Sequence, residues 1–293
     1  VGEKEVRQAF AAAAEEFEEG DVGAGAGTIC YGMKGGIGSA SRVICIGEKE
    51  YTIGVLVQSN FGATEDFVLN GEAVGPKILE WKQEKNDMAA SEEDKGSIMS
   101  ILATDLPLTS RQLKRILKRT GVGIARTGGY TGHGSGEVMI GFTTANRIPS
   151  GREEELLQIS AIPEHVINRA FLAAAEAEQE AILNSMTAAE RTRGLAGELY
   201  YSLAEERESC ITALQNILTT GKSKPQNRLE APFPAISPVL VLLSFDFLHF
   251  FSIIWNMLCQ KINNPSHLSV VSFINCRNNK YCHWNAVLLN CKS

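Results

Sequence analysis

Hydrophobic and polar positions alternate along residues 1–220 in a way that predicts a mixed α/β domain. Short β-rich runs are separated by longer segments of helical period and by turns. Gly47 to Glu50 joins the first two β-rich runs as a hairpin, so a sheet begins there. The predicted strands are residues 42–46, 51–58, 97–104 and 137–144.

Three helices are predicted from their period and their end signals. Lys4 to Glu19 is rich in Ala and Glu and is closed by Gly20. Thr109 or Ser110 caps a second helix, and Pro163 starts a long third helix. The third helix carries an apolar stripe that we interpret as core rather than as a binding face. The stripe comprises Val166, Ile167, Ala170, Phe171, Ala174, Ala181 and Ile182.

The composition changes near residue 221, from Ala, Glu and Gly to Asn, Phe, Cys and Ser. Residues 221–293 therefore form an atypical tail, separate from the domain at 1–220. Val239 to Leu258 is long and apolar enough to span a bilayer. Asp246 lies inside this run, and a central aspartate costs about 2.5 to 3.5 kcal/mol on insertion. A membrane helix is thus less favoured than a disordered or mispredicted extension, and we draw no function from the tail.

Overall composition is that of an ordinary globular protein of 293 residues, with 44% hydrophobic and 21% charged residues. The formal net charge of -6 speaks against nucleic acid as a partner. The seven cysteines form no CxxC pair and no His/Cys metal spacing, so neither a zinc site nor a disulfide scaffold is predicted. From the cysteine pattern we expect free thiols in a reducing, cytoplasmic compartment. Because the chain begins with Val1 rather than Met, we also expect a fragment of a longer protein.

Glycine gathers at three places where a backbone needs positive φ or close approach. They are Gly23 to Gly27, Gly35 to Gly38, and Gly128 to Gly136. A dinucleotide site is disfavoured because the first cluster follows a helix and leads to a β-like run. Gly221-Lys222-Ser223 lacks the earlier glycine and the strand of a phosphate loop. No nucleotide cofactor is expected.

The Gly96-Ser97 step lies between a charged stretch and the apolar run of a predicted strand. Cleavage of this bond would place the free amine of Ser97 beside its own hydroxyl, which activates a serine without a histidine. Such an amine, with a pKa of about 7.7 to 8.0, is partly neutral at pH 7 and can act as a base. Gly96 tolerates the strained backbone that would bring the hydroxyl onto the preceding carbonyl. The step is therefore a candidate self-cleavage site.

Four ordered motifs carry a family resemblance over residues 2 to 218. They are the string GAGTICYGMKGGIGSASR at 25–42, VLVQSNFG at 55–62, Gly96 to Ile98 with ATDLPL at 103–108, and GSGE at 134–137. In this order they resemble the DmpA-type L-aminopeptidase/D-esterase family, which includes the β-peptidyl aminopeptidases. Several ordered motifs over such a length are far more specific than any one of them.

The resemblance implies a four-layer αββα sandwich, incomplete at its N-terminus, that cuts itself between Gly96 and Ser97. It implies that Ser97 is the nucleophile and that the Asn60 side chain donates to the oxyanion. Ser135 and Glu137 match the pair that orients and polarises the nucleophile and its amine, and a carboxylate there could also hold the amine of a peptide substrate. Without the family, Asn60 would be interpreted as a turn former and the other two as loop residues.

The resemblance also implies the partners of the protein. Peptides or amino-acid amides would be its substrates, it would need no metal or cofactor, and its processed heterodimers would assemble into a homo-oligomer. The family's larger chain extends far upstream of Val1, and that segment supplies a tyrosine of the oxyanion site. His133 matches no family role, although a Ser/His pair stays an alternative.

The leading hypothesis is thus a self-processing aminopeptidase that acts through an acyl-enzyme on Ser97. One alternative is an acyltransferase or oligoamide hydrolase of the same fold, although these usually carry threonine as nucleophile. Another is an inactive truncated fragment or a membrane-tethered protein without enzymatic activity. A preference for α- or β-amino acids, or for L or D forms, is not predicted, because pocket shape decides it.

Overall fold

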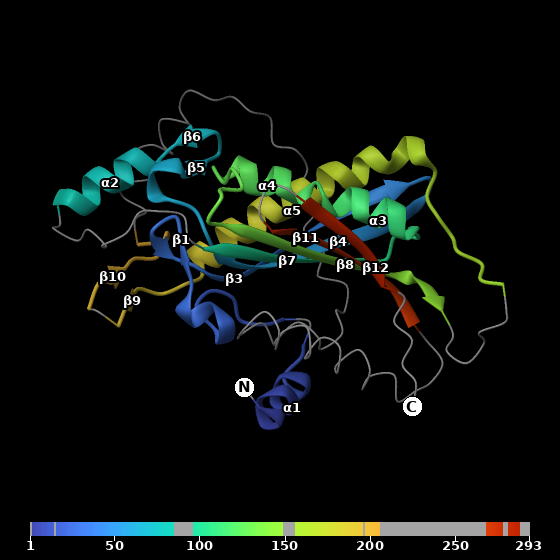
Figure 1. Ribbon diagram of the computed structural model, residues 1–293, viewed down its shortest axis with the longest axis horizontal. Coiled ribbons are helices and arrows are strands. Elements are labelled where there is room, and N and C mark those ends of the chain that lie inside the picture. Colours follow the sequence, from blue (N-terminus) through green and yellow to red (C-terminus); the bar gives the residue numbers. More distant parts are fainter. Residues whose placement is uncertain are drawn as a thin grey trace.

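A six-stranded mixed β-sheet forms the centre of the protein (Figure 1). The computed structural model describes residues 2–14, 16–84, 96–148, 156–195, 197–205, 268–277 and 281–287. The strand order in the sheet is β12-β11-β8-β7-β4-β3. These strands are β3 (Gly36–Ile46), β4 (Lys49–Asn60), β7 (Ser97–Thr104), β8 (Gly136–Ile148), β11 (Leu268–Arg277) and β12 (Tyr281–Val287).

The directions of the strands bring three strand ends together at the same end of the sheet. β3 and β4 form an antiparallel hairpin, and β7 runs antiparallel to β4 but parallel to β8. The carboxyl end of β4 therefore lies beside the amino ends of β7 and β8. On the far side, β11 pairs antiparallel with β8, and β12 pairs antiparallel with β11.

Helices pack against this sheet (Figure 1). α5 (Ile167–Thr187) packs along β3 and β4, α3 (Ser110–Leu117) packs against β8, and α4 (Thr120–Arg126) packs on α5. Fully buried alanines on α5 allow a close approach to the sheet. At Gly38 of β3, an added Cβ would lie 2.0 Å from the carbonyl oxygen of Ala181. Only glycine fits at that contact.

Short elements complete the fold around the sheet. The remaining helices are α1 (Glu3–Ala11), α2 (Gly75–Glu84) and the 3-10 turns η1 (Gly23–Gly27), η2 (Thr64–Asp66) and η3 (Glu164–Val166). The two-stranded pairs are β1 (Ile29–Cys30) with β2 (Met33–Lys34), β5 (Val68–Leu69) with β6 (Glu72–Ala73), and β9 (Thr192–Arg193) with β10 (Leu199–Tyr200).

Apolar side chains alternate between the two faces of the sheet, as the period of a strand requires. Ile98 and Leu102 of β7 are fully buried in the core that contains the α5 side chains. Ile101, on the other face, belongs to a second buried cluster with Leu56 and Ile140. Both faces of the sheet are therefore apolar, which is typical of a sheet that is covered on both sides.

The predicted strands and the second and third helices are confirmed. The Oγ1 of Thr109 accepts a hydrogen bond from the Gln112 backbone nitrogen (3.2 Å), and the Gln112 side chain accepts one from the Thr109 nitrogen (3.2 Å). This reciprocal capping box starts α3. The apolar stripe of α5 is core as predicted: Ile167, Ala170, Ala174, Ala181 and Ile182 are buried, and Val166 and Phe171 pack against them.

The first predicted helix is too long. α1 ends at Ala11, and Glu19 instead lies beside β3, where its carboxylate accepts a hydrogen bond from Ser39. Ala9 is the only residue of α1 that is buried. Helices of this length gain most of their stability from packing, so the Ala/Glu composition alone does not extend this one.

The second glycine cluster lies mostly in a strand, because Gly36 to Gly38 begin β3. β3 begins at Gly36, six residues before the predicted strand. A Cβ at Gly36 would lie 2.3 Å from the carbonyl oxygen of Gly20, which bridges to Ile37. Glycine is needed here because two backbone segments touch.

Within the tail, the structure describes only β11 and β12, and their backbone extends the sheet beyond β8. The apolar run at 239–258 lies outside the described residues. No helix in the described part of the chain has both the length and the hydropathy to cross a membrane. The interpretation of residues 221–293 as a separate tail stays a prediction.

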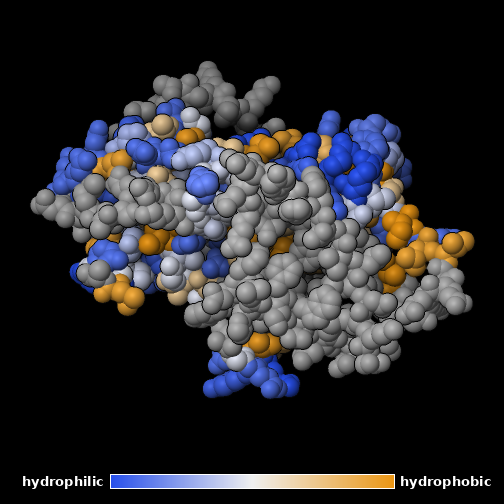
Figure 2. Space-filling model, viewed as in Figure 1, coloured by the Kyte–Doolittle hydropathy of each residue, from blue (hydrophilic) through white to orange (hydrophobic). Residues whose placement is uncertain are grey.

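Exposed apolar side chains gather on the segment that leads into α5, seen at the right-hand edge of Figure 2. Leu156, Leu157 and Ile159 are exposed by 99%, 51% and 40%. This segment follows the carboxyl end of β8, whereas the three strand ends described above meet at the amino end of β8. It therefore takes no part in the site that follows.

Candidate active site

Three strand ends place the predicted site residues in one row across the sheet. Asn60, the last residue of β4, pairs with Ser97, the first residue of β7. Ser97 also pairs with Gly136, the first residue of β8, and Ser135 directly precedes that glycine. The register therefore brings together residues that lie far apart in the sequence.

Ser97 is exposed, and its hydroxyl lies against the peptide bond that precedes it. Its Oγ donates a hydrogen bond to the carbonyl oxygen of Gly96 at 2.7 Å. A Cβ at Gly96 would lie 1.8 Å from the Asn60 carbonyl oxygen, so no side chain fits at this position. The Gly96–Ser97 peptide bond therefore lies between the Ser97 hydroxyl and the end of β4. This arrangement suits an attack of the hydroxyl on the Gly96 carbonyl.

The side chain of Asn60 is held by one backbone group. Its Oδ1 accepts a hydrogen bond from the Ile29 nitrogen at 3.0 Å. This contact distinguishes the two ends of the carboxamide: the oxygen faces Ile29, and the NH2 group is turned away from it. The end that is turned away is the donor that an oxyanion requires.

A tight hairpin supports the end of β4, and the sequence did not reveal it as part of the site. Tyr31 and Gly32 both have positive φ (51° and 69°) and form the two-residue turn between β1 and β2. Tyr31 is fully buried, its nitrogen donates to the Phe61 carbonyl (2.9 Å), and its ring packs edge-on against Phe61. Its hydroxyl bonds Thr127 at 2.9 Å. The residue after Asn60 is therefore fixed from two sides.

Ser135 and Glu137 flank Gly136 and relate differently to Ser97. The Oγ of Ser135 is buried and, among the residues that the structure describes, has no hydrogen-bond partner. Glu137 is 6% exposed and pairs with Ile98, whose side chain faces the helices. Ser97 is one register position away, so its side chain and that of Glu137 leave opposite faces of the sheet.

His133 lies on the glycine-rich loop that leads to Ser135. It is exposed, and within the described residues no hydrogen bond joins it to Ser97. Gly128 anchors the start of this loop with φ +103°, and a Cβ there would lie 1.8 Å from the Asp66 carbonyl oxygen. The start of the loop is thus held in place. No contact observed in the described residues gives His133 a role beside Asn60, Ser97 or Ser135.

A buried carboxyl behind β7 is a second feature that sequence reasoning missed. Glu178 of α5 is fully buried, and the Oγ of Ser100 donates to its Oε1 at 2.5 Å. Its Oε2 has no partner among the described residues. Burial raises the pKa of Glu178 to about 8, although the Ser100 hydrogen bond opposes this shift. The group is therefore protonated in the folded protein at neutral pH.

Glu178 makes the stability of the protein depend on pH. Because its folded pKa is raised from 4.5 to about 8, its contribution is fully present below pH 4.5 and is lost as the pH rises toward 8. Each pH unit in this window costs about 1.4 kcal/mol of unfolding free energy. Glu178→Gln keeps the acceptor for Ser100 without a charge, so we expect it to match the wild type near pH 4 and to be about 3 kcal/mol more stable at pH 7.

Urea unfolding of both proteins between pH 4 and 8 measures this difference. Glu176→Gln is the matched control, because Glu176 lies on the same helix but is half-buried in an ion pair with Arg42 (3.2 Å). It should be slightly less stable than the wild type, by less than about 1 kcal/mol. A stability difference between Glu178→Gln and the wild type that stays constant over this pH range would refute the assignment.

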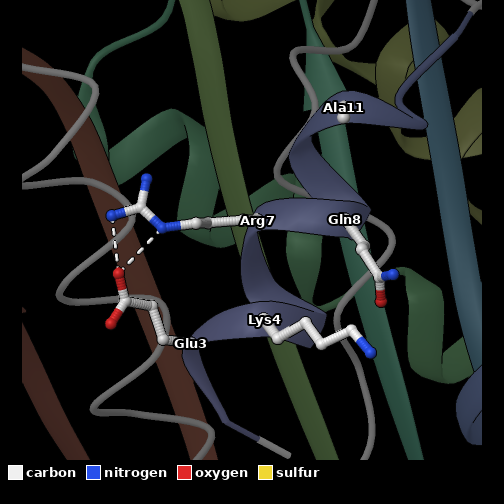
Figure 3. Close-up of a pocket in the computed structure, with 5 residues that line it drawn as sticks. All are labelled: Glu3, Lys4, Arg7, Gln8 and Ala11. Carbon is white, nitrogen blue, oxygen red and sulfur yellow. Dashed lines mark hydrogen bonds and ion pairs between the residues drawn. The ribbon is translucent and has the colours of Figure 1, made fainter.

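A shallow pocket on α1 lies apart from the row of strand ends (Figure 3). It is lined by Glu3, Lys4, Arg7, Gln8 and Ala11, all from this helix. Arg7 and Glu3 pair with each other at 2.6 Å and are both largely exposed. The pocket contains none of the predicted site residues, and Glu3 and Arg7 in it are paired with each other at the surface.

Comparison with known proteins places these residues in a family. Residues 1–200 match the family model described as Peptidase family S58. The chain is 35% identical over 196 residues to the beta-peptidyl aminopeptidase BapA of Sphingosinicella xenopeptidilytica, covering 64% of this chain and 49% of the relative. It is 36% identical over 203 residues to BapA of Sphingosinicella microcystinivorans, covering 67% and 51%. The chain thus spans about half the length of these curated relatives.

Solved structures share the fold. The PH0078 protein from Pyrococcus horikoshii OT3 matches with a TM-score of 0.64 and 44% identity, covering 73% of this chain and 57% of that one. The L-aminopeptidase D-Ala-esterase/amidase from Ochrobactrum anthropi, described as a variant of the Ntn-hydrolase fold, matches with 0.59 and 36%, covering 68% and 53%. A beta-aminopeptidase from Burkholderia sp. matches with 0.59 and 32%, covering 71% and 56%. The predicted fold class is confirmed as an Ntn-hydrolase-like fold with a mixed sheet packed by helices.

Proposed function

Because this chain belongs to peptidase family S58, we propose that it carries the nucleophile of a self-processing serine aminopeptidase. The observation that carries the proposal is the contact between the Ser97 hydroxyl and the Gly96 carbonyl, at the centre of the row of strand ends. Asn60 on one side of that row and Ser135 on the other supply the polar groups that the chemistry needs. The activity proposed is that of the whole protein, of which this chain is the part with the nucleophile.

Processing begins with attack of the Ser97 Oγ on the carbonyl carbon of Gly96. The C–N bond breaks as the hydroxyl proton passes to the Ser97 nitrogen, and the Gly96 acyl group becomes an ester on Oγ. Water then hydrolyses the ester, which leaves a carboxylate on Gly96 and a free amine and hydroxyl on Ser97. The hydrogen bond from Oγ to the oxygen of this carbonyl supports such a step, because it places the hydroxyl next to the group that it attacks.

After processing, the Ser97 amine acts as the base for its own hydroxyl. It takes the proton while Oγ attacks the substrate carbonyl, and it returns the proton to the leaving amine as the acyl-enzyme forms. Asn60 donates its amide N–H to the oxyanion of the tetrahedral intermediate. Water, activated by the same amine, releases the acyl group and restores Ser97.

Ser135 and Glu137 act on the amine of Ser97 rather than on its hydroxyl. The Glu137 side chain leaves the other face of the sheet, and the Ser97 backbone nitrogen lies between the two faces. The buried Ser135 hydroxyl, which has no partner in the described part of the chain, supplies a hydrogen bond to the amine once it is free. Glu137 then stabilises the protonated amine, or the ammonium of a peptide substrate.

Substrates are proposed to be peptides, amides or esters with a free N-terminal amino acid. This follows the relatives, which are named beta-peptidyl aminopeptidases and an L-aminopeptidase D-Ala-esterase/amidase. We further propose a homo-oligomer of processed heterodimers that uses no cofactor. His133 has no part in this mechanism, which predicts that His133→Ala keeps its activity. The Ser/His alternative predicts that the same variant loses activity.

Release of p-nitroaniline from β-alanyl and L-alanyl p-nitroanilides tests the activity. The full-length protein should release p-nitroaniline from at least one of the two, and the ratio of the rates reports its preference for β- or α-amino acids. Absence of release from both, in a protein that is folded and cleaved at Ser97, would refute the aminopeptidase function.

A further inference from the structure

We infer that Lys34 is a positioning residue that sets the oxyanion donor Asn60 through a single peptide group. Lys34 contacts the carbonyl end of the peptide between Thr28 and Ile29, and Asn60 contacts its N–H end. The inference rests on the proposed function, in which Asn60 donates to the oxyanion. It adds a residue that touches neither substrate nor nucleophile.

The Lys34 ammonium is caged by backbone oxygens. Lys34 is 1% exposed, and its Nζ donates to the carbonyls of Gly25 (2.6 Å), Thr28 (3.0 Å) and Gly35 (2.9 Å). Three N–H donors thus meet three acceptors. Burial lowers the pKa of Lys34, and the nearby charge of Asp21 opposes this shift. A buried charge is costly, so packing alone does not account for a lysine here.

One planar peptide group connects this cage to the candidate site. The Thr28 oxygen and the Ile29 nitrogen belong to the same peptide unit and are rigidly coupled. The ammonium at the oxygen polarises the unit and makes the Ile29 N–H a stronger donor to the Asn60 Oδ1. Asn60 is then held with its NH2 group turned away from Ile29, and its N–H becomes a stronger donor in turn.

The hairpin explains how the sequence builds this arrangement. Tyr31 and Gly32 turn the chain so that Ile29 pairs with Lys34 across β1 and β2. The backbone nitrogen of Lys34 donates a hydrogen bond to the Tyr201 carbonyl oxygen at 2.7 Å, which holds the strand in place. Lys34 is thereby placed next to the Thr28–Ile29 peptide, whose carbonyl oxygen also accepts a hydrogen bond from the Gly35 nitrogen (3.1 Å).

Lys34→Met tests the inference, because it removes the charge and keeps a long side chain. In the processed full-length protein we expect kcat to fall about 10- to 100-fold with KM changed less than about threefold, which is the effect of a misplaced donor. The loss should stay below the 10²- to 10³-fold typical of removing an oxyanion donor itself. Gln112→Met is the control: Gln112 is also buried and its side chain donates to the Ile162 carbonyl (2.7 Å), away from the hairpin, and its loss should lower stability but leave kcat within about twofold.

A second variant removes the N–H group of the relay bond. Ile29→Pro lacks the N–H, and Thr28 already has the extended conformation (φ -93°, ψ 149°) that a residue before proline adopts. It should lose kcat to a similar extent. Combining Lys34→Met with Asn60→Ala should be no slower than Asn60→Ala alone, because Lys34 acts through Asn60. A further loss in the double variant, or an unchanged kcat in Lys34→Met, would overturn the inference.

A spectroscopic readout separates this inference from the proposed function. In the uncleaved Ser97→Ala protein, Lys34→Met should move the Ile29 amide proton upfield and speed its hydrogen exchange at least about tenfold, while Gln112→Met should leave both unchanged. An Ile29 amide that does not respond refutes the relay even if the enzyme proves inactive. A wild-type protein without cleavage or hydrolysis refutes the proposed function, and the amide signature still decides on Lys34.

Discussion

The Ser97→Ala variant is expected to remain one uncleaved chain and to lose aminopeptidase activity by at least about 10⁴-fold, as other hydrolases do without their nucleophile. The hydroxyl that contacts the Gly96 carbonyl is the only group of Ser97 that the variant removes. Both the processing step and the acyl-enzyme need that oxygen. Gel electrophoresis of the purified protein and the p-nitroanilide assay measure the two losses separately.

Ser100→Ala is the matched control for this variant. Ser100 lies on the same strand, and its hydroxyl bonds Glu178 behind the sheet rather than the site. Its loss should change stability but leave two chains and normal hydrolysis. Cleavage that persists in Ser97→Ala would show that another residue, or a contaminating protease, cuts the chain.

Asn60→Ala is expected to lower kcat about 10²- to 10³-fold with little change in KM, because the amide is needed only when the oxyanion forms. Alanine also leaves the Ile29 N–H without its acceptor, so the end of β4 should lose some order. Steady-state kinetics on the better p-nitroanilide substrate measure the split between kcat and KM.

Two variants control for this structural loss. Asn60→Asp keeps an oxygen for Ile29 but replaces the donor, so it should lose at least as much kcat as Asn60→Ala. Asn146→Ala removes a buried asparagine at the other end of the sheet, where the side chain donates to the Leu108 and Ser160 carbonyls (both 2.9 Å). That variant should be less stable with kcat unchanged. Equal kcat losses in Asn60→Ala and Asn146→Ala would remove Asn60 from the mechanism.

The strands were predictable from the sequence, whereas their arrangement was not. Alternation and β-rich composition place β4, β7 and β8 correctly, because these are local properties. The parallel pairing of β7 with β8 is a long-range property, and it is what puts Ser97 between Asn60 and Gly136. The site residues were therefore expected from ordered family motifs, since Asn60 and Ser135 alone resemble turn and loop residues.

Other parts of the site escaped prediction for physical reasons. Lysine is rarely buried, so the sequence around Lys34 did not predict that backbone carbonyls surround its ammonium group. Tyr31 needs a positive φ, which local pattern assigns to glycine rather than to a bulky residue. The place of Gly36 and Gly38 in a strand was not predicted, because their backbone contacts with Gly20 and α5 are visible only in the fold. The Ala/Glu-rich segment before Gly20 was extended too far because propensity does not report burial.

Intact-mass spectrometry of the wild-type full-length protein, with sequencing of each N-terminus, tests the central claim most directly. The account predicts two chains, one ending at Gly96 and one beginning at Ser97, in equal amounts. A single uncleaved chain, or a second chain that begins at any residue other than Ser97, would contradict it.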